Sequence, residues 1–173
     1  MLEDLSLHIL DIAINSLAAG AKTLHITVLE DIRRDWLIIR IHDDGQGMDE
    51  KTLQAVLRRN LTGKKGRRRP IGLGLAFLRQ TSEMCGGTFH VRSAPGKGTS
   101  VTASMRFSHI DRPPLGDLNA TILALCAHRD VDVRLHYLSN GQAFHFSSQE
   151  GRPHEPRGTQ KTQRESAASG RAA

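Results

Sequence analysis

The chain has 173 residues, 38% of them hydrophobic and 24% charged, which is enough to bury one sizeable core and favours a single globular domain over two. Its formal net charge is +6, but seven basic residues fall in the acid-free stretch 58–69, so the rest of the chain carries −1. The basicity is therefore local, and the stretch is either a solvated loop or a contact site for phosphate, nucleic acid or an acidic protein.

Cysteine spacing, the start of the chain and the lack of a long apolar run argue against a zinc protein, a secreted protein and a membrane protein. Cys85 and Cys126 are far apart in the sequence and show neither a CxxC motif nor the Cys/His spacing of a zinc site. The acidic start MLEDLSLHIL is unlike a signal peptide, and no apolar run approaches the roughly 20 residues that span a bilayer. We therefore expect a cytoplasmic protein without membrane contact.

Hydrophobic periodicity predicts helices and strands through the first part of the chain. In chain order the predicted elements are a helix at 3–19, strands at 23–30 and 36–42, helices at 49–57 and 73–85, and strands at 88–93 and 99–107. The first two strands are expected to form an antiparallel pair. The predicted fold is a two-layer α/β sandwich in which helices pack on one face of a mixed β-sheet.

The remaining sequence divides into two parts. Residues 108–148 contain a predicted helix and a predicted hairpin, and form a small appendage whose residues indicate no chemistry. Residues 149–173 have almost no aliphatic side chains to bury, so we predict a disordered tail there. The expected organisation is a domain at 1–107, followed by the appendage and the tail.

Polar residues of the first helix form the first of four motifs. Asp11 and Asn15 are one turn apart and project from one face, which His8 shares. An asparagine oxygen can ligate Mg²⁺ that already carries phosphate oxygens, and a neighbouring carboxylate can polarise water or a hydroxyl group. The alternative interpretation is a buried helix with incidental polar residues.

The second motif, DDGQGM, begins at Asp43, where a strand meets a loop. Gly45 and Gly47 let the backbone turn tightly and approach a flat ligand. A carboxylate at the end of a strand can accept a hydrogen bond from an exocyclic amine such as that of adenine. An ordinary β-turn explains the same residues equally well.

The third and fourth motifs are glycine-rich. GLGLAF starts at Gly72 and opens a helix, where free backbone N–H groups form an anion site. The preceding basic residues, among them Lys64 and Lys65, would then flank phosphate groups, unless the stretch is a solvated loop. In GKGT, Lys97 and Thr99 are candidates to line the same pocket, although a hairpin turn explains the glycines.

Together, the four motifs resemble the GHKL, or Bergerat-fold, ATPase superfamily of gyrase, Hsp-type chaperones, mismatch-repair ATPases and histidine kinases with their anti-sigma-factor relatives. The resemblance covers about residues 5–107 and places the ATP lid of the family at the basic stretch. It implies an asparagine that ligates Mg²⁺ at Asn15 and an aspartate that recognises adenine at Asp43. The residues implied to bind the nucleotide are Asn15, Asp43, Gly45, Gly47, Met48, Lys64, Lys65, Gly72, Leu73, Gly74, Leu75 and Thr99.

Two positions depart from the family pattern. Asp11 stands where relatives carry glutamate or asparagine, so the implied catalytic base is kept but is one methylene shorter than glutamate. Ile14 replaces the acidic residue of the mismatch-repair branch. His8 lies on the ATP-binding helix itself, so we expect a structural role for it rather than a role as phosphoacceptor.

The resemblance implies a protein that binds ATP and Mg²⁺. The histidine-bearing hairpin of histidine kinases has no room before the first motif, so we expect a stand-alone regulator or kinase that phosphorylates a separate protein. The alternative is an ATP hydrolase or a nucleotide-gated switch without phosphotransfer. A basic module that binds nucleic acid is disfavoured because the cationic stretch lacks interleaved aromatic residues. A homodimer is left open.

Overall fold

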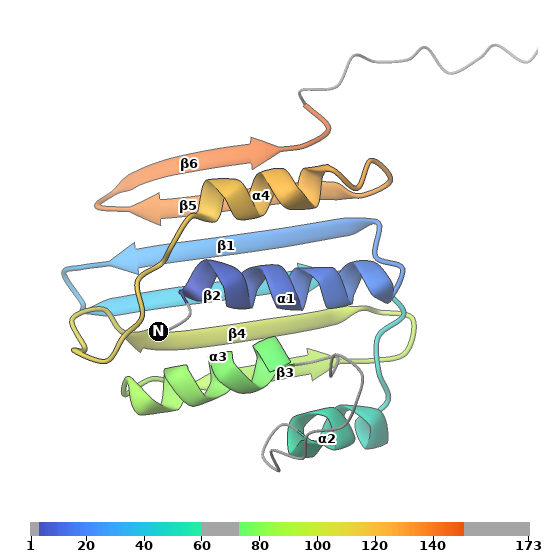
Figure 1. Ribbon diagram of the computed structural model, residues 1–173, viewed down its shortest axis with the longest axis horizontal. Coiled ribbons are helices and arrows are strands. Elements are labelled where there is room, and N and C mark those ends of the chain that lie inside the picture. The colour runs from blue at the N-terminus through green and yellow to red at the C-terminus, as the bar shows by residue number, and fades with distance from the viewer. Residues whose placement is uncertain (1–3, 60–72, 151–173) are drawn as a thin grey trace, which may run out of the picture.

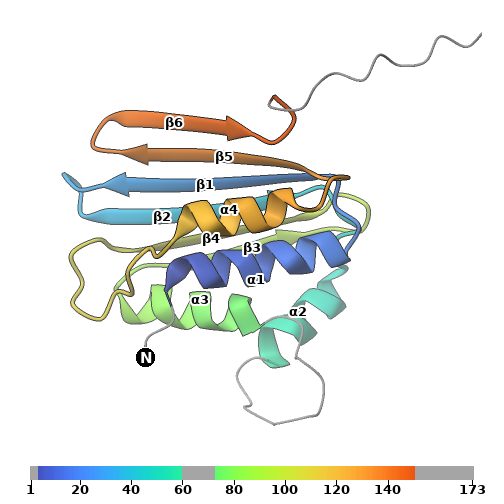
Figure 2. The ribbon, with the colours of Figure 1, turned by 45° about the horizontal axis from the view of Figure 1, so that its top comes forward.

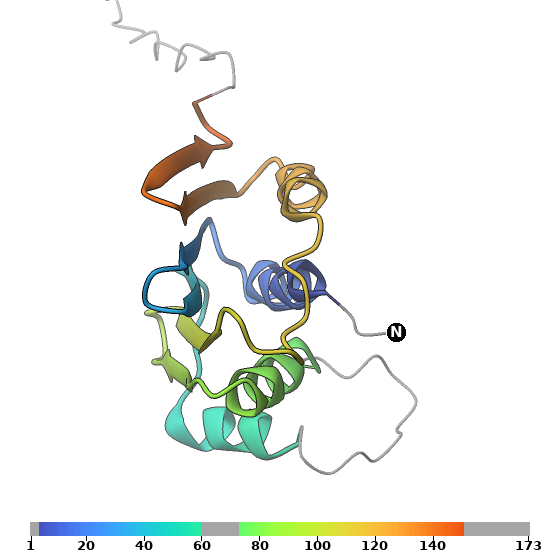
Figure 3. The same cartoon turned by 90° about the vertical axis from the view of Figure 1, so that its left-hand side faces the viewer.

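The structure is a computed structural model that describes residues 4–59 and 73–150. The described residues form a six-stranded sheet and four helices, and the helices lie together on one side of the sheet (Figure 3). The helices are α1 (Leu5–Ala18), α2 (Glu50–Arg59), α3 (Leu73–Met84) and α4 (Leu118–Cys126). The strands are β1 (Thr23–Asp31), β2 (Trp36–Asp43), β3 (Phe89–Ser93), β4 (Thr99–Arg106), β5 (Asp132–Ser139) and β6 (Gln142–Ser147).

The strands follow the order β3-β4-β2-β1-β5-β6 across the sheet (Figure 1). β1 and β5 pair in parallel, whereas the other four neighbouring pairs are antiparallel. The sheet is therefore mixed, and β1 and β2 form the predicted antiparallel pair. The two-layer α/β fold with helices on one face is confirmed.

The alternation of side chains along the strands decides which face of the sheet is buried. Successive side chains of a strand point to opposite faces. In β1, Leu24, Ile26 and Val28 are at most 1% exposed and point to the helices, whereas His25 and Thr27 point to the other side. The core lies between the sheet and the helices. We call the opposite side, on which no described helix packs, the open face (Figure 3).

Helix α1 lies in the middle of the helix layer, between α3 and α4 (Figures 1 and 2). Asp4 caps its first turn by accepting a hydrogen bond from the Leu7 amide at 3.0 Å. Leu5 and Ile9, among other apolar residues of α1, are fully buried against the sheet. This packing fixes the position of the polar residues that α1 carries beside them.

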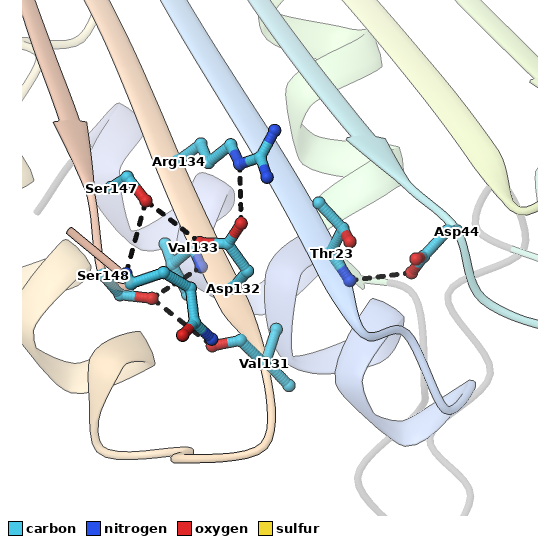
Figure 4. A network of polar contacts seen from close by, with 9 residues as sticks. Thr23, Asp44, Val131, Asp132, Val133, Arg134, Ser147 and Ser148 are labelled. Atoms are coloured by element: carbon cyan, nitrogen blue, oxygen red, sulfur yellow. Dashed lines mark hydrogen bonds and ion pairs between the residues drawn. The ribbon is translucent and has the colours of Figure 1, made fainter. Parts of the chain in front are cut away.

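The segment 108–148 contains the predicted helix and hairpin and continues both layers of the fold. β5 extends the sheet beside β1, and Leu125 and Val133 join the main hydrophobic core. The backbone before α4 accepts hydrogen bonds from the first turn of α1. At the end of the hairpin, the hydroxyl of Ser148 accepts a hydrogen bond from the Val133 amide at 3.0 Å (Figure 4).

None of the helices in the described part of the chain has the length and apolar character that a membrane crossing requires.

Candidate functional site

A cavity of about 290 Å³ opens between the sheet and helices α1, α2 and α3. Its walls are mainly apolar, and Ile41, Leu75 and Val101 are among the side chains that form them. Polar side chains enter this apolar space from α1, from the end of β2 and from the start of β4, and they are Asn15, Ser16, Asp43 and Thr99. A mainly apolar cavity with a few convergent polar groups is typical of a small-molecule site.

The carboxylate of Asp43 is buried at the end of β2, with 4% of the residue exposed. Its Oδ1 accepts hydrogen bonds from the backbone amides of Gly45 at 2.9 Å and Thr99 at 3.2 Å. Its Oδ2 accepts a hydrogen bond from the Ser16 hydroxyl at 2.6 Å. A carboxylate offers about four lone-pair sites, so these three donors leave one acceptor position on Oδ2. The site therefore presents a fixed hydrogen-bond acceptor to a ligand.

Gly98 explains why β4 begins so close to this carboxylate. A Cβ atom at Gly98 would lie 1.9 Å from the backbone oxygen of Asp43, and the φ angle of Gly98 is +74°. Only glycine combines this left-handed backbone with such a close approach. The glycine therefore lets the loop between β3 and β4 pack on the end of β2, which brings the Thr99 amide to Asp43.

Asp44, the next residue along the chain, supports the site from outside the cavity. Its Oδ1 accepts hydrogen bonds from the amides of Lys22 at 2.7 Å and Thr23 at 2.8 Å, which holds the start of β1 against the end of β2. Figure 4 shows the bond from Thr23. Burial raises the pKa of the Asp44 carboxyl, but the hydrogen bonds from Thr23 and Lys22 outweigh burial, and the pKa lies below its ordinary value. The two neighbouring aspartates thus have separate tasks.

The polar face of α1 is divided between the cavity and α3. Asn15 lines the cavity, and its Nδ2 is buried without a hydrogen-bond partner among the described residues. The Oδ2 of Asp11 accepts a hydrogen bond from the Gly74 amide at 2.6 Å. A Cβ atom at Gly74 would lie 2.8 Å from that oxygen and 3.2 Å from the backbone oxygen of His8, so a larger residue there would displace the Asp11 carboxylate. His8 is buried and stacks on Phe77 of α3, with ring centroids 5.8 Å apart.

The structure brings six of the residues predicted to bind a nucleotide to the walls of this cavity, namely Asn15, Asp43, Gly47, Met48, Leu75 and Thr99. Gly45 is not among the residues that line the cavity, but its amide donates a hydrogen bond to the Asp43 carboxylate. Gly74 faces Asp11, and Leu73 is the first residue of α3. Lys64, Lys65 and Gly72 lie outside the described residues. Lys97, which was expected to line the same pocket, lines a second cavity instead and is not part of this one.

Sequence reasoning missed Ser16, the residue that binds the carboxylate most closely. Ser16 is 5% exposed, and its hydroxyl also bonds to the backbone oxygen of Ile12 at 3.3 Å. One signal was available, because Ser16 lies one turn after Ile12 on the apolar, sheet-facing side of the helix. A polar residue on that side needs a buried partner, and Asp43 is the one that the fold supplies.

Comparison with known proteins gives one family. Residues 2–109, more than half of the chain, match the family of histidine kinase-, DNA gyrase B-, and HSP90-like ATPases. The sensor histidine kinase YvrG of Bacillus subtilis strain 168 is 30% identical over 90 residues, which are 51% of this chain and 16% of YvrG. The sensor histidine kinase WalK of the same organism is 30% identical over 98 residues, 54% of this chain and 16% of WalK. The chain thus spans less than a fifth of these relatives.

Among solved structures, the chain is similar to the MutL ATPase domain of Aquifex aeolicus complexed with ADP. The TM-score is 0.48 and the identity is 14%, over 83% of this chain and 62% of that domain.

Proposed function

The chain belongs to the family of histidine kinase-, DNA gyrase B-, and HSP90-like ATPases, and from this premise we propose that its cavity binds Mg-ATP. The observation that carries the proposal is the buried carboxylate of Asp43, which keeps one acceptor position in an otherwise apolar cavity. Adenine combines flat apolar faces with an exocyclic amine, so the base fits both properties of the cavity. The family membership supports the same ligand.

We call the part of the cavity at Asp43 the base end, and it would select adenine over guanine. The exocyclic amine of adenine donates a hydrogen bond to the free position on Asp43 Oδ2, whereas guanine presents a carbonyl oxygen at the corresponding place. Two acceptors facing each other in a buried site leave both unsatisfied, which costs roughly 1–3 kcal/mol. Ile41 and Val101 would contact the faces of the base.

We call the part of the cavity at Asn15 the phosphate end, where the phosphates of the nucleotide would lie. The carboxamide of Asn15 lines the cavity, and its buried Nδ2 lacks a partner within the described residues, so the group has unused hydrogen-bonding or ligating capacity. Rotation of the carboxamide by half a turn exchanges its oxygen and nitrogen, so the oxygen can face a cation. Because Mg²⁺ retains water and phosphate oxygens as ligands, one protein oxygen fits such a site. When bound, Mg²⁺ would neutralise negative charge on the phosphates.

We assign Asp11 the role of base or positioning group for the attacking nucleophile. Its carboxylate lies one turn from Asn15 and is held by the Gly74 amide at 2.6 Å, so its orientation is fixed before a substrate arrives. The nucleophile in the first candidate function is a side chain of a separate protein, which would receive the γ-phosphoryl group. The partial similarity to sensor histidine kinases supports this candidate.

A nucleotide-gated switch is the second candidate, and the Asp11 contact with α3 favours it. The amide of Gly74 lies at the N-terminus of α3, where a phosphate group would also bind. A bound phosphate therefore competes with Asp11 for this amide. Exchange of one partner for the other would couple nucleotide binding to the position of α3, with or without phosphotransfer.

Calorimetric titration of the full chain tests the proposed ligand. A non-hydrolysable ATP analogue should bind about 10-fold or more tightly than the matching GTP analogue, and more tightly with Mg²⁺ than without it. Equal affinity for the two analogues would refute the assignment of the base end. Incubation with γ-labelled ATP, with and without a cell extract as the source of acceptor proteins, then separates the candidates. A kinase labels a protein of the extract, a hydrolase releases labelled phosphate without the extract, and a switch that only binds ATP does neither.

A further inference from the structure

The open face of the sheet carries a dense set of basic side chains. Strand register aligns these side chains in two rows that run across the sheet. The first row carries Arg92, His42, His25 and Arg134. The second row carries His90, Arg40, His136 and His145. We call these two rows the cationic band, and it includes five of the nine histidines of the chain.

One end of the cationic band is hollowed. A second cavity of about 240 Å³ lies there, lined by His42, Arg92 and Lys97 together with hydroxyl groups such as that of Ser100. None of the described residues that line it is acidic. Neither Arg92 nor Lys97 forms an ion pair within the described part of the chain. Cations and hydroxyl donors without a carboxylate form a site for an anionic group.

Few acidic groups compensate the cationic band. Asp132 lies beside its first row and binds Arg134 at 2.6 Å with 12% of its side chain exposed (Figure 4). Asp44 lies near the same end of the strands, where it binds the amides of Lys22 and Thr23. Arg40, like Arg92 and Lys97, has no carboxylate partner among the described residues. The charges of Arg40, Arg92 and Lys97 are therefore not compensated by an ion pair within the described part of the chain.

A third row on the open face is apolar. It follows the cationic band toward the other end of the strands and carries Ile38, Leu29, Leu138 and Ala143, with the polar Ser104 at the β4 end of the row. We call this row the apolar band. Its three larger side chains point away from the core and are partly exposed. The open face thus combines a cationic band and an apolar band that run parallel across the strands.

We propose that the open face docks an acidic amphipathic segment of a partner protein, with its carboxylates on the cationic band and its apolar side chains on the apolar band. Six strands span roughly 24 Å, and three rows cover about 14 Å along the strands. These dimensions accommodate one helix of about 10–12 Å diameter lying across the strands. A carboxylate of the segment would enter the hollow lined by Arg92 and Lys97.

Nucleic acid fits this surface less well than an acidic protein segment. The charged phosphates of a nucleic acid would make no favourable contact with the apolar band. Base stacking needs exposed aromatic faces, but the ring of Trp36 on the open face is covered by the Arg106 guanidinium at 4.1 Å. The described residues also place no helix or protruding ribbon on the open face that could enter a groove (Figure 3).

The histidines give the docking a defined pH dependence. Burial, the charge of Arg134 and the neighbouring His42 hold the pKa of His25 below its ordinary value; His136 acts in the same direction and Asp132 in the opposite one. A bound carboxylate favours the protonated imidazole, so binding takes up protons. The affinity for an acidic segment should therefore rise as the pH falls from about 8 to about 6.

Fluorescence anisotropy with the full chain tests the proposal. The probe is a labelled amphipathic peptide of about 18 residues, ~27 Å long as a helix, with glutamate on one face and leucine on the other. It should bind more tightly at the lower pH, and Arg92→Ala with Lys97→Ala should weaken binding about tenfold. Leu29→Thr with Leu138→Thr should also weaken it several-fold. Arg33→Ala with Lys51→Ala, which removes equal charge elsewhere on the surface, should leave binding unchanged.

The outcomes separate the docking surface from the nucleotide site. Each variant must retain its thermal melting transition and its affinity for the ATP analogue, so failure of the proposed nucleotide site is scored apart from failure of docking. Equal binding of a peptide with glutamine in place of glutamate would overturn the proposal. So would absence of peptide binding, or tighter binding of a single-stranded oligonucleotide that the Leu29→Thr and Leu138→Thr changes do not affect.

Discussion

The two ends of the main cavity are built in opposite ways. At the base end, Asp43 receives three hydrogen bonds from α1, the loop after β2 and the start of β4 before any ligand arrives. At the phosphate end, Asn15 has a buried nitrogen without a partner within the described residues, and Asp11 binds the N-terminus of α3. Recognition of the base is therefore organised by the fold, whereas the phosphate end has contacts that a ligand would complete or replace.

The largest expected effect comes from breaking the base end at Gly98. In Gly98→Ala the new methyl group collides with the Asp43 backbone, and the left-handed φ angle alone costs about 1–3 kcal/mol for alanine. We expect a loss of stability above this range in denaturant unfolding, together with loss of ATP binding. Gly96→Ala is the matched control: Gly96 also has a left-handed φ angle, but its Cβ position is open. Equal destabilisation by both substitutions would contradict the close approach.

Removal of one donor to Asp43 should have the next largest effect. Ser16→Ala leaves the buried Oδ2 without its protein partner, which should cost about 1–3 kcal/mol of stability. The affinity for ATP should fall because the carboxylate is no longer held in place. Ser82→Ala is the matched control, since Ser82 is a buried helical serine that binds only the backbone oxygen of Leu78 in the described structure. The same loss of ATP affinity in both variants would argue against a specific role for Ser16.

A change at the phosphate end should affect chemistry more than stability. Asp11→Asn keeps an oxygen for the Gly74 amide but removes the charge, so we expect a stability loss of roughly 1 kcal/mol or less. Binding of the ATP analogue should persist, because the base end is unchanged. Turnover, as phosphate release or protein labelling, should fall. Turnover at the original rate would exclude Asp11 as the base.

The smallest expected effect is on the pH dependence of the free energy of unfolding, through Asp44 beside the base end. The folded pKa of Asp44 is lower than its unfolded value of 3.8, so its contribution to stability is complete above that value and is lost as the pH falls through the folded pKa. Asp44→Asn should therefore make unfolding less dependent on pH below about 5. Urea titrations of both proteins between about pH 5 and pH 3 measure this. If the free energy of unfolding depended on pH equally in both proteins, the stabilising role of the two hydrogen bonds from the amides would be contradicted.

The same contrast explains what could be predicted from the sequence. Helix and strand periodicity predicted the order of elements and the mixed sheet, because Leu24, Ile26 and Val28 alternate with polar residues and the glycines mark the turns. The spacing of Asp11 and Asn15 placed both on one helix face. The partners of these side chains depend on contacts between distant segments, such as Ser16 with Asp43 and Asp11 with Gly74. Periodicity carries no information about such pairs.

The rows of basic side chains on the open face could not be predicted from the sequence either. His25, His42 and Arg134 come from three strands, and they form one row because of the strand register. The basic stretch at 58–69 is visible in the sequence as a run, whereas these basic residues are scattered along it. The pairing of β1 with β2 joins His25 to His42, and the pairing of β1 with β5, which crosses about a hundred residues, adds Arg134.

The most direct test of the base end is calorimetric titration of Asp43→Asn with ATP and GTP analogues. The carboxamide can keep an oxygen for the amides of Gly45 and Thr99, but it places an N–H₂ group where the free acceptor was. The ATP analogue should therefore bind about tenfold or more weakly, while the GTP analogue loses less or gains. Unchanged preference for ATP in a folded Asp43→Asn protein would show that Asp43 does not read the base.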